Sequence, residues 1–493
     1  MTSFSPSSSS ISNQWGSFHN ESVQHLIHQS IGEYKASPIS DKIQKLEDKL
    51  FEDEAITELI DLIHNYDPLL NDEKYDNEYV KIDAKIIRIK KALFYLSDSY
   101  VFLNHGAFGC ALKSMVKLRN EWTEYMEEQP VKFIDRELLP VLVYATRLVA
   151  KWLKIEPTKV VLTSNASTAL TTVFRSIATR NKQARILRLS ICYGAVKKMT
   201  DAFDFKVTEL QITLPMLSFE ESLFTPIKAI LMKARAKKEQ FVLATFDHIA
   251  SNSAILLPIV QLTALLHSFG VLVCIDGAHG PLAGFSDGEE LNLNDFAPDY
   301  YVGNFHKWMC SVKGNAFLYV HNASDTEYLS PPCVSHGYGS GFTSNFIWSG
   351  LNDYSTRITL IHLLKFWDKI GLAQMKLYCT KLAQWATRYM VSKWNTRSLI
   401  DHSLINQDPV IPMVCVLLPQ LPDFYTLDPL TKITQPSILQ NLLFDSYQIE
   451  VPVKVLDGKL YVRISAHCYN RKSDYIQLAK TIQELSQRYE IKQ

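Results

Sequence analysis

The feature that most constrains the fold is an alternation of short apolar runs with helix-length amphipathic segments, which begins near Val101. The runs are rich in β-branched and aromatic residues, as strands are. They are Lys159–Thr163, Arg185–Ser190, Val207–Ile212, Phe241–Phe246, Val271–Ile275, Tyr300–Gly303 and Ala316–Val320. Helical periodicity separates most of them, for example at Ala166–Ala178 and Pro226–Lys237. Strands joined by helical crossovers form a mostly parallel sheet between helices, so the sequence predicts an α/β fold.

The pattern differs on either side of this region and predicts four parts. They are a serine-rich N-terminus (1–38), a helical extension (39–95), a large α/β domain (96–346) and a smaller C-terminal α+β domain (347–493). The first part has too few aliphatic residues at its start to offset its ordering entropy, so we expect it to be disordered. Helical spacing between Ile39 and Tyr66 predicts one or two amphipathic helices. These helices would pack on the body of the protein or on a partner subunit.

The last part combines helices and strands. Its expected elements are a long helix at Thr356–Ile370 stopped by Gly371, strands near Val410–Leu418 and Lys459–Ile464, and a final helix from Ser473 to about Tyr489. The long apolar stretch Ala254–Ala278 contains proline, glutamine, histidine and aspartate, so it is read as a helix followed by a buried strand, not as a membrane span.

Charge and cysteine content restrict the class of partner. Lysine plus arginine equal aspartate plus glutamate at 51 each, so nothing draws the chain to nucleic acid or to an anionic membrane. A small molecule is the expected partner. Eight cysteines without a CxxC pair favour neither a disulfide framework nor structural zinc. The N-terminus lacks the pattern of a signal peptide or presequence, and cytoplasm is the expected location.

Two predicted strands are followed by residues suited to pyridoxal phosphate (PLP) chemistry. Asp276 directly follows the strand at Val271–Ile275, and Lys307 lies shortly after the strand at Tyr300–Gly303. In parallel sheets, ligands bind beyond the carboxyl ends of the strands. PLP needs a lysine to form a Schiff base with its aldehyde and a carboxylate to keep its pyridine nitrogen protonated. By spacing alone, however, such an aspartate could equally cap a helix.

The exact strings are more specific. Four of them are Asp276-Gly-Ala-His279-Gly-Pro, Gly303-Asn-Phe-His306-Lys307-Trp308, Leu103-Asn104-His105-Gly106-Ala107-Phe108-Gly109, and the segment from Val462 to Asn470 that contains Arg463. Together with the turn Ser164–Ser167, they resemble the class V aminotransferase family of fold-type I PLP enzymes. The closer match is the isopenicillin N epimerase-like branch, which includes cysteine C–S lyases. The resemblance covers about residues 95–490.

For the cofactor, the resemblance implies a role for each of several residues. Lys307 would carry PLP and move the substrate Cα proton, Asp276 would pair with the pyridinium nitrogen, and His279 would approach the phenolic oxygen. The backbone of Asn165, Ala166 and Ser167 at a helix start, with His306 as a further donor, would hold the phosphate. Tyr193 would stack on the ring, and Ser251 stands where related desulfurases place an asparagine. Each of these residues taken alone also has a purely structural reading as a cap, a core residue or a loop residue.

For the substrate, Arg463 would clamp the α-carboxylate in a bidentate manner. Asn104 and His105 are further substrate-side candidates. The family forms homodimers in which a threonine reaches the partner's phosphate, but here Leu351 stands in that position and supplies no hydroxyl. No metal is expected, because His105, His248, His279 and His306 show no metal-ligand spacing.

The sequence leaves the type of reaction open between several alternatives. Persulfide chemistry needs a mobile cysteine, but Cys379 and Cys415 lie in apolar periodic segments, and Cys333 lies too close in sequence to Lys307. A C–S lyase that acts on a cysteine derivative by β-elimination is the favoured prediction, because it needs only one base and a leaving group. An amino-acid epimerase or an aminotransferase is the alternative, and a cofactor-free binding protein is a second one.

Overall fold

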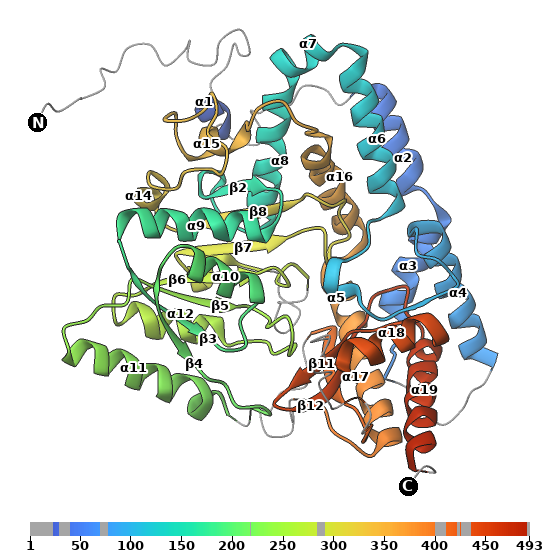
Figure 1. The fold of residues 1–493 in the computed structure, drawn as a ribbon. Helices are drawn as coiled ribbons and strands as arrows, with labels where there is room; N and C mark the ends of the chain where they lie inside the picture. The colour runs from blue at the N-terminus through green and yellow to red at the C-terminus, as the bar shows by residue number, and fades with distance from the viewer. Residues whose placement is uncertain are drawn as a thin grey trace, which may run out of the picture.

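The structure is a computed structural model. It describes residues 23–28, 40–69, 77–216, 218–282, 291–399, 411–421, 424 and 435–490. Figure 1 shows a large sheet with helices on both faces and, beside it, a smaller unit formed by the C-terminal part of the chain. Within the described residues, no helix is long and apolar enough to cross a membrane.

The large sheet contains all seven predicted strands. They are β2 (Val160–Thr163), β3 (Arg185–Leu189), β4 (Lys206–Leu210), β5 (Leu243–Asp247), β6 (Leu272–Gly277), β7 (Tyr300–Asn304) and β8 (Ala316–Val320). Their order is β2-β8-β7-β6-β5-β3-β4. Pairing is parallel from β7 to β4, and β8 runs antiparallel to both of its neighbours. The predicted mostly parallel mixed sheet of the α/β fold is therefore confirmed.

Alternating side chains of the strands build two hydrophobic clusters, one on each face of the sheet. On one face, Ile186 packs in a cluster with helix α9 (Ala166–Arg180). On the other face, Leu187 packs in a cluster that includes helices α8 (Leu138–Trp152), α12 (Ile259–His267) and α16 (Ser355–Ile370). The long apolar stretch at 254–278 thus contains helix α12 and the buried strand β6 (Leu272–Gly277), as predicted.

The smaller unit has a three-stranded antiparallel sheet of order β11-β12-β9, made of β11 (Val453–Leu456), β12 (Lys459–Ser465) and β9 (Met413–Leu417). It is accompanied by the helices α17 (Leu372–Trp394), α18 (Gln435–Tyr447) and α19 (Lys472–Glu490). Helix α16 ends at Gly371, whose φ of 91° is accessible to glycine without steric cost. The predicted helix stop is therefore confirmed.

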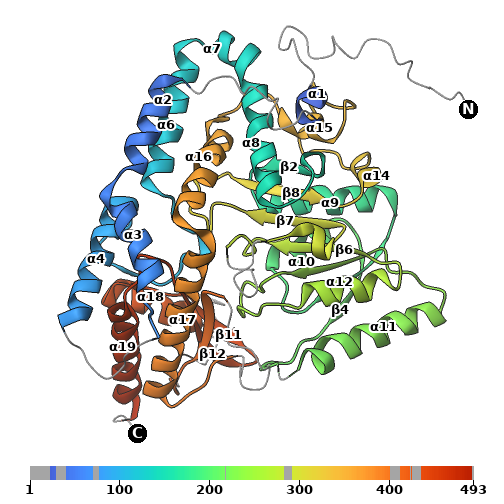
Figure 2. The same ribbon diagram turned by 180° about the vertical axis from the view of Figure 1, so that it is seen from behind.

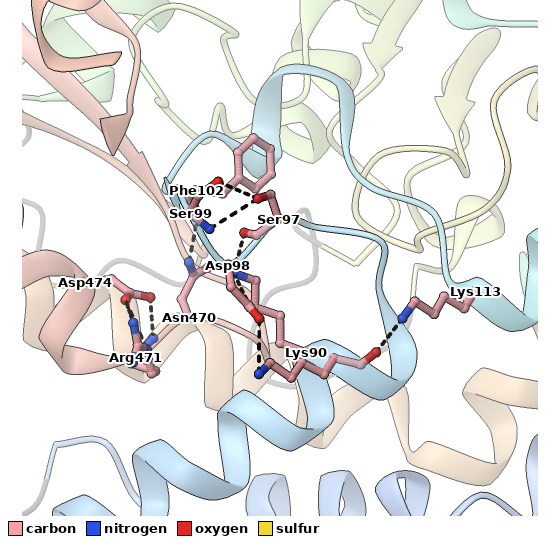
Figure 3. Close-up of polar contacts among 10 residues, drawn as sticks. Lys90, Ser97, Asp98, Ser99, Phe102, Lys113, Asn470, Arg471 and Asp474 are labelled. Carbon is pink, nitrogen blue, oxygen red and sulfur yellow. Dashed lines mark hydrogen bonds and ion pairs between the residues drawn. The ribbon is translucent and has the colours of Figure 1, made fainter. Parts of the chain in front are cut away.

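A short parallel pair ties the opening motif to this unit. Strand β1 (Val101–Phe102) pairs with β10 (Ile449–Glu450). The side-chain amide of Asn470 donates to the Phe102 carbonyl at 2.8 Å, a contact drawn in Figure 3. Figure 3 also shows Lys90 near Ser97 and Asp98, where the chain leaves the helical extension. These contacts fix the strand that leads into Asn104 and His105.

The helical extension packs on the body of this same chain, which resolves one open alternative. Figure 2 shows α2 (Asp41–Phe51) beside α6 (Lys113–Glu128), and α3 (Glu54–Asn65) and α4 (Asn77–Leu93) beside the C-terminal helices. The carboxylate of Glu47 is 2% exposed and accepts from His362 Nδ1 at 2.8 Å. Trp122 donates to the other ring nitrogen of His362 at 2.8 Å.

The expected disorder of residues 1–38 needs one correction. Residues Val23–His28 form helix α1, whose Val23, Leu26 and Ile27 are buried, and Arg147 donates to the carbonyls of Leu26 and Ile27. The aliphatic residues missing from the serine-rich start are present here, so this turn can bury apolar surface. The rest of the segment lies outside the described residues.

Candidate active site

The Lys307 amine faces a histidine that favours its uncharged form. Lys307 Nζ lies 3.2 Å from His279 Nε2, and the Trp308 indole donates to His279 Nδ1 at 3.2 Å. An indole N–H can only donate, so the neutral imidazole carries its hydrogen on Nε2 and points it at the amine. Burial, opposed in part by Asp276, lowers the pKa of Lys307 to about 8. At pH 7 about a tenth of this lysine is therefore uncharged and nucleophilic, far more than of an ordinary lysine.

Two carboxylates lie side by side at the ends of β5 and β6. Asp247 and Asp276 are register partners, and they are 4% and 5% exposed. Burial raises the pKa of Asp276, although its bond from the Ala278 amide (3.0 Å) and the charge of Lys307 oppose the rise. Burial and the neighbouring Asp276 raise the pKa of Asp247 well above its usual value. A cation beside Asp276, such as a pyridinium nitrogen, would stabilise the charge of this buried carboxylate.

The start of α9 forms the candidate phosphate site, but its donors differ from those expected. Asn165 caps the helix by accepting from the Thr168 amide at 2.8 Å, and the Ala166 amide already donates to Asn304 Oδ1 at 2.9 Å. The Ala166 amide is therefore engaged. The backbone amide of Asn165, and the amide and hydroxyl of the exposed Ser167, are the donors of the predicted set that remain to meet an anion.

His306 also differs from the expected donor role. Its Nδ1 lies 3.1 Å from the Asn315 carbonyl, which can only accept, so the hydrogen is on Nδ1. Burial, with the charge of Lys313 adding to it, lowers the pKa of His306 to about 4. The neutral ring therefore presents Nε2 as an acceptor. It can donate to a phosphate only if the phosphate charge stabilises the imidazolium form.

Tyr193 and Ser251 lie on two loops that Asp247 connects. The Tyr193 amide donates to Asp247 Oδ1 at 3.4 Å, and Asp247 also accepts from the Ser251 backbone. The Tyr193 ring is 45% exposed at the N-cap of helix α10 (Gly194–Ala202), so it is free to stack on a planar ligand. The backbone carbonyl of Ser251 accepts from Arg463.

Arg463 is held in place for an anion. It extends from β12, is 3% exposed, and donates to the Ser251 carbonyl and to Asn104 Oδ1, the latter at 3.2 Å. Asn104 in turn donates to Glu450 at 2.7 Å. The buried Nε of Arg463 has no hydrogen-bond partner among the described residues. Because unsatisfied buried donors are costly, this atom supports a bound carboxylate at Arg463.

His105 requires a correction, since it supports the lysine backbone and not the substrate. It is fully buried, its Nε2 lies 3.0 Å from the Lys307 carbonyl, and its Nδ1 lies 2.6 Å from the Tyr469 hydroxyl. Its ring stacks on His467 at 4.2 Å. His105, Cys310 and His467 have ligand-type atoms within 4.8 Å of one another, a juxtaposition that chain spacing could not reveal.

The structure explains why the opening motif ends in a glycine, Gly109. Its φ is +63°, and a Cβ there would lie 2.6 Å from the Lys307 carbonyl oxygen and 2.7 Å from the Lys307 Cα. Only glycine therefore lets this turn pack directly on the lysine backbone. The sequence did not predict four residues of the site, namely Trp308, Asp247, Asn304 and Glu450. Each of them contributes through a hydrogen bond to a residue distant in sequence.

The cysteines and Leu351 complete the account of the predicted residues. Cys379 and Cys415 are buried, as predicted, and burial raises the pKa of Cys415 to about 12. Cys333 is exposed, and its thiol lies 3.3 Å from the Ser349 carbonyl. Leu351 is 79% exposed.

The residues fit PLP. A lysine of lowered pKa, a buried carboxylate across from it, an open helix start and an arginine with an unsatisfied donor are the groups that an amino-acid-binding PLP site requires. When bound, PLP supplies an electron sink for a negative charge that develops on the substrate Cα.

Comparison with known proteins gives concordant results. The family model described as Aminotransferase class-V matches residues 137–408. The chain is 27% identical over 421 residues to the "Probable L-cysteine desulfhydrase, chloroplastic" of Arabidopsis thaliana, which covers 80% of this chain and 85% of that protein. It is 27% identical over 385 residues to the isopenicillin N epimerase of Amycolatopsis lactamdurans, which covers 73% and 89% respectively.

The fold also matches solved structures. The apo cysteine desulfurase of Thermococcus onnurineus NA1 superimposes with a TM-score of 0.60 at 16% identity, covering 81% of this chain and 97% of that one. At this identity the likeness supports the fold alone, and it agrees with the fold-type I architecture that the motifs implied.

Proposed function

Because the chain belongs to the class-V aminotransferase family and is a PLP-dependent enzyme, we propose that it is a C–S lyase that acts on cysteine or a cysteine derivative. The observation that carries the proposal is the Lys307 amine, which has a pKa of about 8 and faces His279 Nε2 at 3.2 Å. This amine is a base of suitable strength to take the Cα proton near neutral pH. The desulfhydrase relative supports the choice of substrate class.

The other residues bind and orient the substrate. Arg463, held by Ser251 and Asn104, would fix the α-carboxylate, so that the Cα–H bond points toward Lys307. Asp276 would stabilise the positive charge on the cofactor nitrogen, and the Trp308–His279 pair would orient the donor aimed at Lys307. The Cβ–S bond would then break with its electron pair on the sulfur, and the proton that Lys307 took from Cα would pass to the departing thiolate.

The cysteines support elimination over transfer of sulfur to the protein. Cys415 is 1% exposed and has a pKa raised to about 12, so its thiolate is not accessible. Cys379 is fully buried, and burial raises its pKa further still. A β-elimination that converts L-cysteine and water into pyruvate, ammonia and hydrogen sulfide needs no such thiolate.

The experiment is an end-product assay on the holoenzyme. With L-cysteine, pyruvate and sulfide should form in equal amounts, and a Lys307→Ala variant should form neither. Exchange of the Cα proton in heavy water without pyruvate would favour the epimerase alternative, which the relative from Amycolatopsis lactamdurans supports. A protein that gains no near-visible absorption with added PLP would contradict the whole proposal.

We further propose that the chain acts as a homodimer in a reducing compartment such as the cytoplasm. Several large apolar side chains are exposed, among them Phe108 (76%), Val334 (58%), Tyr338 (58%) and Leu351 (79%), and a second copy could cover them. All eight cysteines lie in the described residues, and all are free. Light scattering of the holoenzyme tests the dimer, and a monomeric mass would contradict it.

A further inference from the structure

We propose that Lys454 binds a second anionic group of the substrate, which makes cysteine derivatives with an acidic S-substituent the preferred substrates. This inference rests on the proposed C–S lyase function and specifies its substrate class. It starts from the face of the small sheet that carries Arg463.

Lys454 and Arg463 extend from the same face of this sheet. Lys454 on β11 is the register partner of Tyr461 on β12, and Arg463 is the partner of Cys415 on β9. Paired residues in antiparallel strands point to the same side, as do residues two apart, such as Tyr461 and Arg463. Lys454 therefore stands one row from Arg463, about 7 Å along the strand direction.

This face meets the active-site loop of the large domain. The Cys415 thiol lies 3.4 Å from the Asn252 carbonyl, and Arg463 donates to the Ser251 carbonyl. The row that holds Lys454 lies next to the row that holds the carboxylate clamp. A substrate bound at Arg463 could extend its side chain along this row.

The charges on this face are unbalanced. Arg463 is 3% exposed and Lys454 is half-buried. Burial, together with the charge of Arg463, lowers the pKa of Lys454. Neither cation forms an ion pair within the part of the chain that the structure describes. The Glu450 carboxylate belongs to the same network but accepts its hydrogen bond from Asn104.

A buried cation beside a half-buried one, with no carboxylate between them, is unfavourable in the free protein. One α-carboxylate would neutralise the charge of Arg463 and leave the charge of Lys454 without a counterion. A ligand with a second anionic group one row away would satisfy both, and a neutral side chain would leave Lys454 desolvated. Discrimination would therefore arise from an unpaired charge as well as from a new contact.

The test compares two substrates that differ only in charge. S-carboxymethyl-L-cysteine and S-carbamoylmethyl-L-cysteine are nearly isosteric. A charge-assisted hydrogen bond contributes about 1.5 kcal/mol or more, so kcat/KM of the holoenzyme should favour the carboxymethyl compound at least about tenfold. Lys454→Gln should bring this ratio close to one, and Lys454→Arg should preserve most of it.

A matched control is available on the same strand pair. Lys459 is exposed and lies on the same face of the sheet, farther from Arg463. Lys459→Gln should keep the wild-type ratio. An equal loss for both substrates in the Lys454→Gln variant would show that Lys454 serves the shared α-carboxylate, which would overturn the inference. A wild-type ratio near one would overturn it as well.

A binding titration separates this inference from the proposed reaction. Each compound is titrated into the holoenzyme, and the change in near-visible absorption gives its Kd. If neither compound is cleaved but the carboxymethyl compound binds about tenfold more tightly in a manner that depends on Lys454, the lyase proposal fails and the anionic subsite stands. If both are cleaved with equal kcat/KM and bind with equal Kd, the subsite fails and the lyase stands.

Discussion

Replacing Trp308 with phenylalanine removes the hydrogen bond that fixes the tautomer of His279. The indole donates to His279 Nδ1 at 3.2 Å, and this leaves Nε2–H to face the Lys307 amine. In the variant, the ring is free to carry its hydrogen on Nδ1 and to accept from the lysine through Nε2. That arrangement stabilises the ammonium form, so the pKa of Lys307 should rise above its value of about 8.

The magnitude follows from the energy of one hydrogen bond. A net contribution of about 1 kcal/mol or slightly more corresponds to about one pKa unit. At pH 7.5 roughly a quarter of the wild-type amine is uncharged, and a pKa of about 9 would reduce this to roughly 3%. The rate at which the apoenzyme takes up PLP covalently depends on the uncharged amine, so it should fall about eightfold at this pH and little above pH 10.

The assay follows the growth of the near-visible band of the apoenzyme with added PLP from pH 6.5 to 10. Trp367→Phe is the matched control, because Trp367 is 2% exposed and donates to the Met309 carbonyl at 2.8 Å without touching His279. It should lose a similar amount of stability and keep the wild-type pH midpoint. A Trp308→Phe protein that is folded and has an unshifted midpoint would refute the reasoning.

Three further predictions follow from other parts of the structure. Gly109→Ala should abolish PLP uptake or solubility, because its Cβ would lie 2.7 Å from the Lys307 Cα, and a fully active variant would contradict the model of this turn. Glu47→Ala should lower the free energy of unfolding by about 2 kcal/mol in urea, since it leaves the buried His362 Nδ1–H unsatisfied. Burial raises the pKa of Glu47, but the hydrogen bond and charge of His362 outweigh it and hold this pKa below its usual value. The stabilisation by Glu47 is therefore fully present above its unfolded-state pKa and is lost as the pH falls through its folded-state pKa. The free energies of unfolding of wild type and variant should converge in acid. Cys333→Ser should leave sulfide production unchanged, whereas a loss of all activity would restore a persulfide route.

Local sequence accounted for the large sheet and for the position of Lys307 shortly after strand β7. The seven strands of that sheet could be predicted because apolar runs of four to six residues alternate with amphipathic helices, and burial on both faces selects for that pattern. Asp276 and Lys307 could be predicted because each follows a strand and stands in a distinctive string. Asp276 lies near the carboxyl end of β6, where its register partner on β7 is Val302.

The interpretation failed where a group's role depends on its neighbours in space. Ala166 and His306 were expected to donate to a phosphate, but Asn304 occupies the amide of one and Asn315 the Nδ1 of the other. His105 was assigned to the substrate and instead lies behind the lysine. Chain spacing carries no information on which hydrogen-bonding capacity is already in use.

The sequence by itself therefore determined the fold class and the family and predicted Lys307 as the lysine for the cofactor, because these follow from periodicity and short contiguous motifs. Only the tertiary structure decided the protonation of that lysine, the tautomer of His279 and the cation pair of Arg463 and Lys454. These properties depend on burial and on contacts between β-strands and loops that are distant along the chain. The same desolvation that lowers the pKa of Lys307 to about 8 makes it a base, and no pattern of residues reports desolvation.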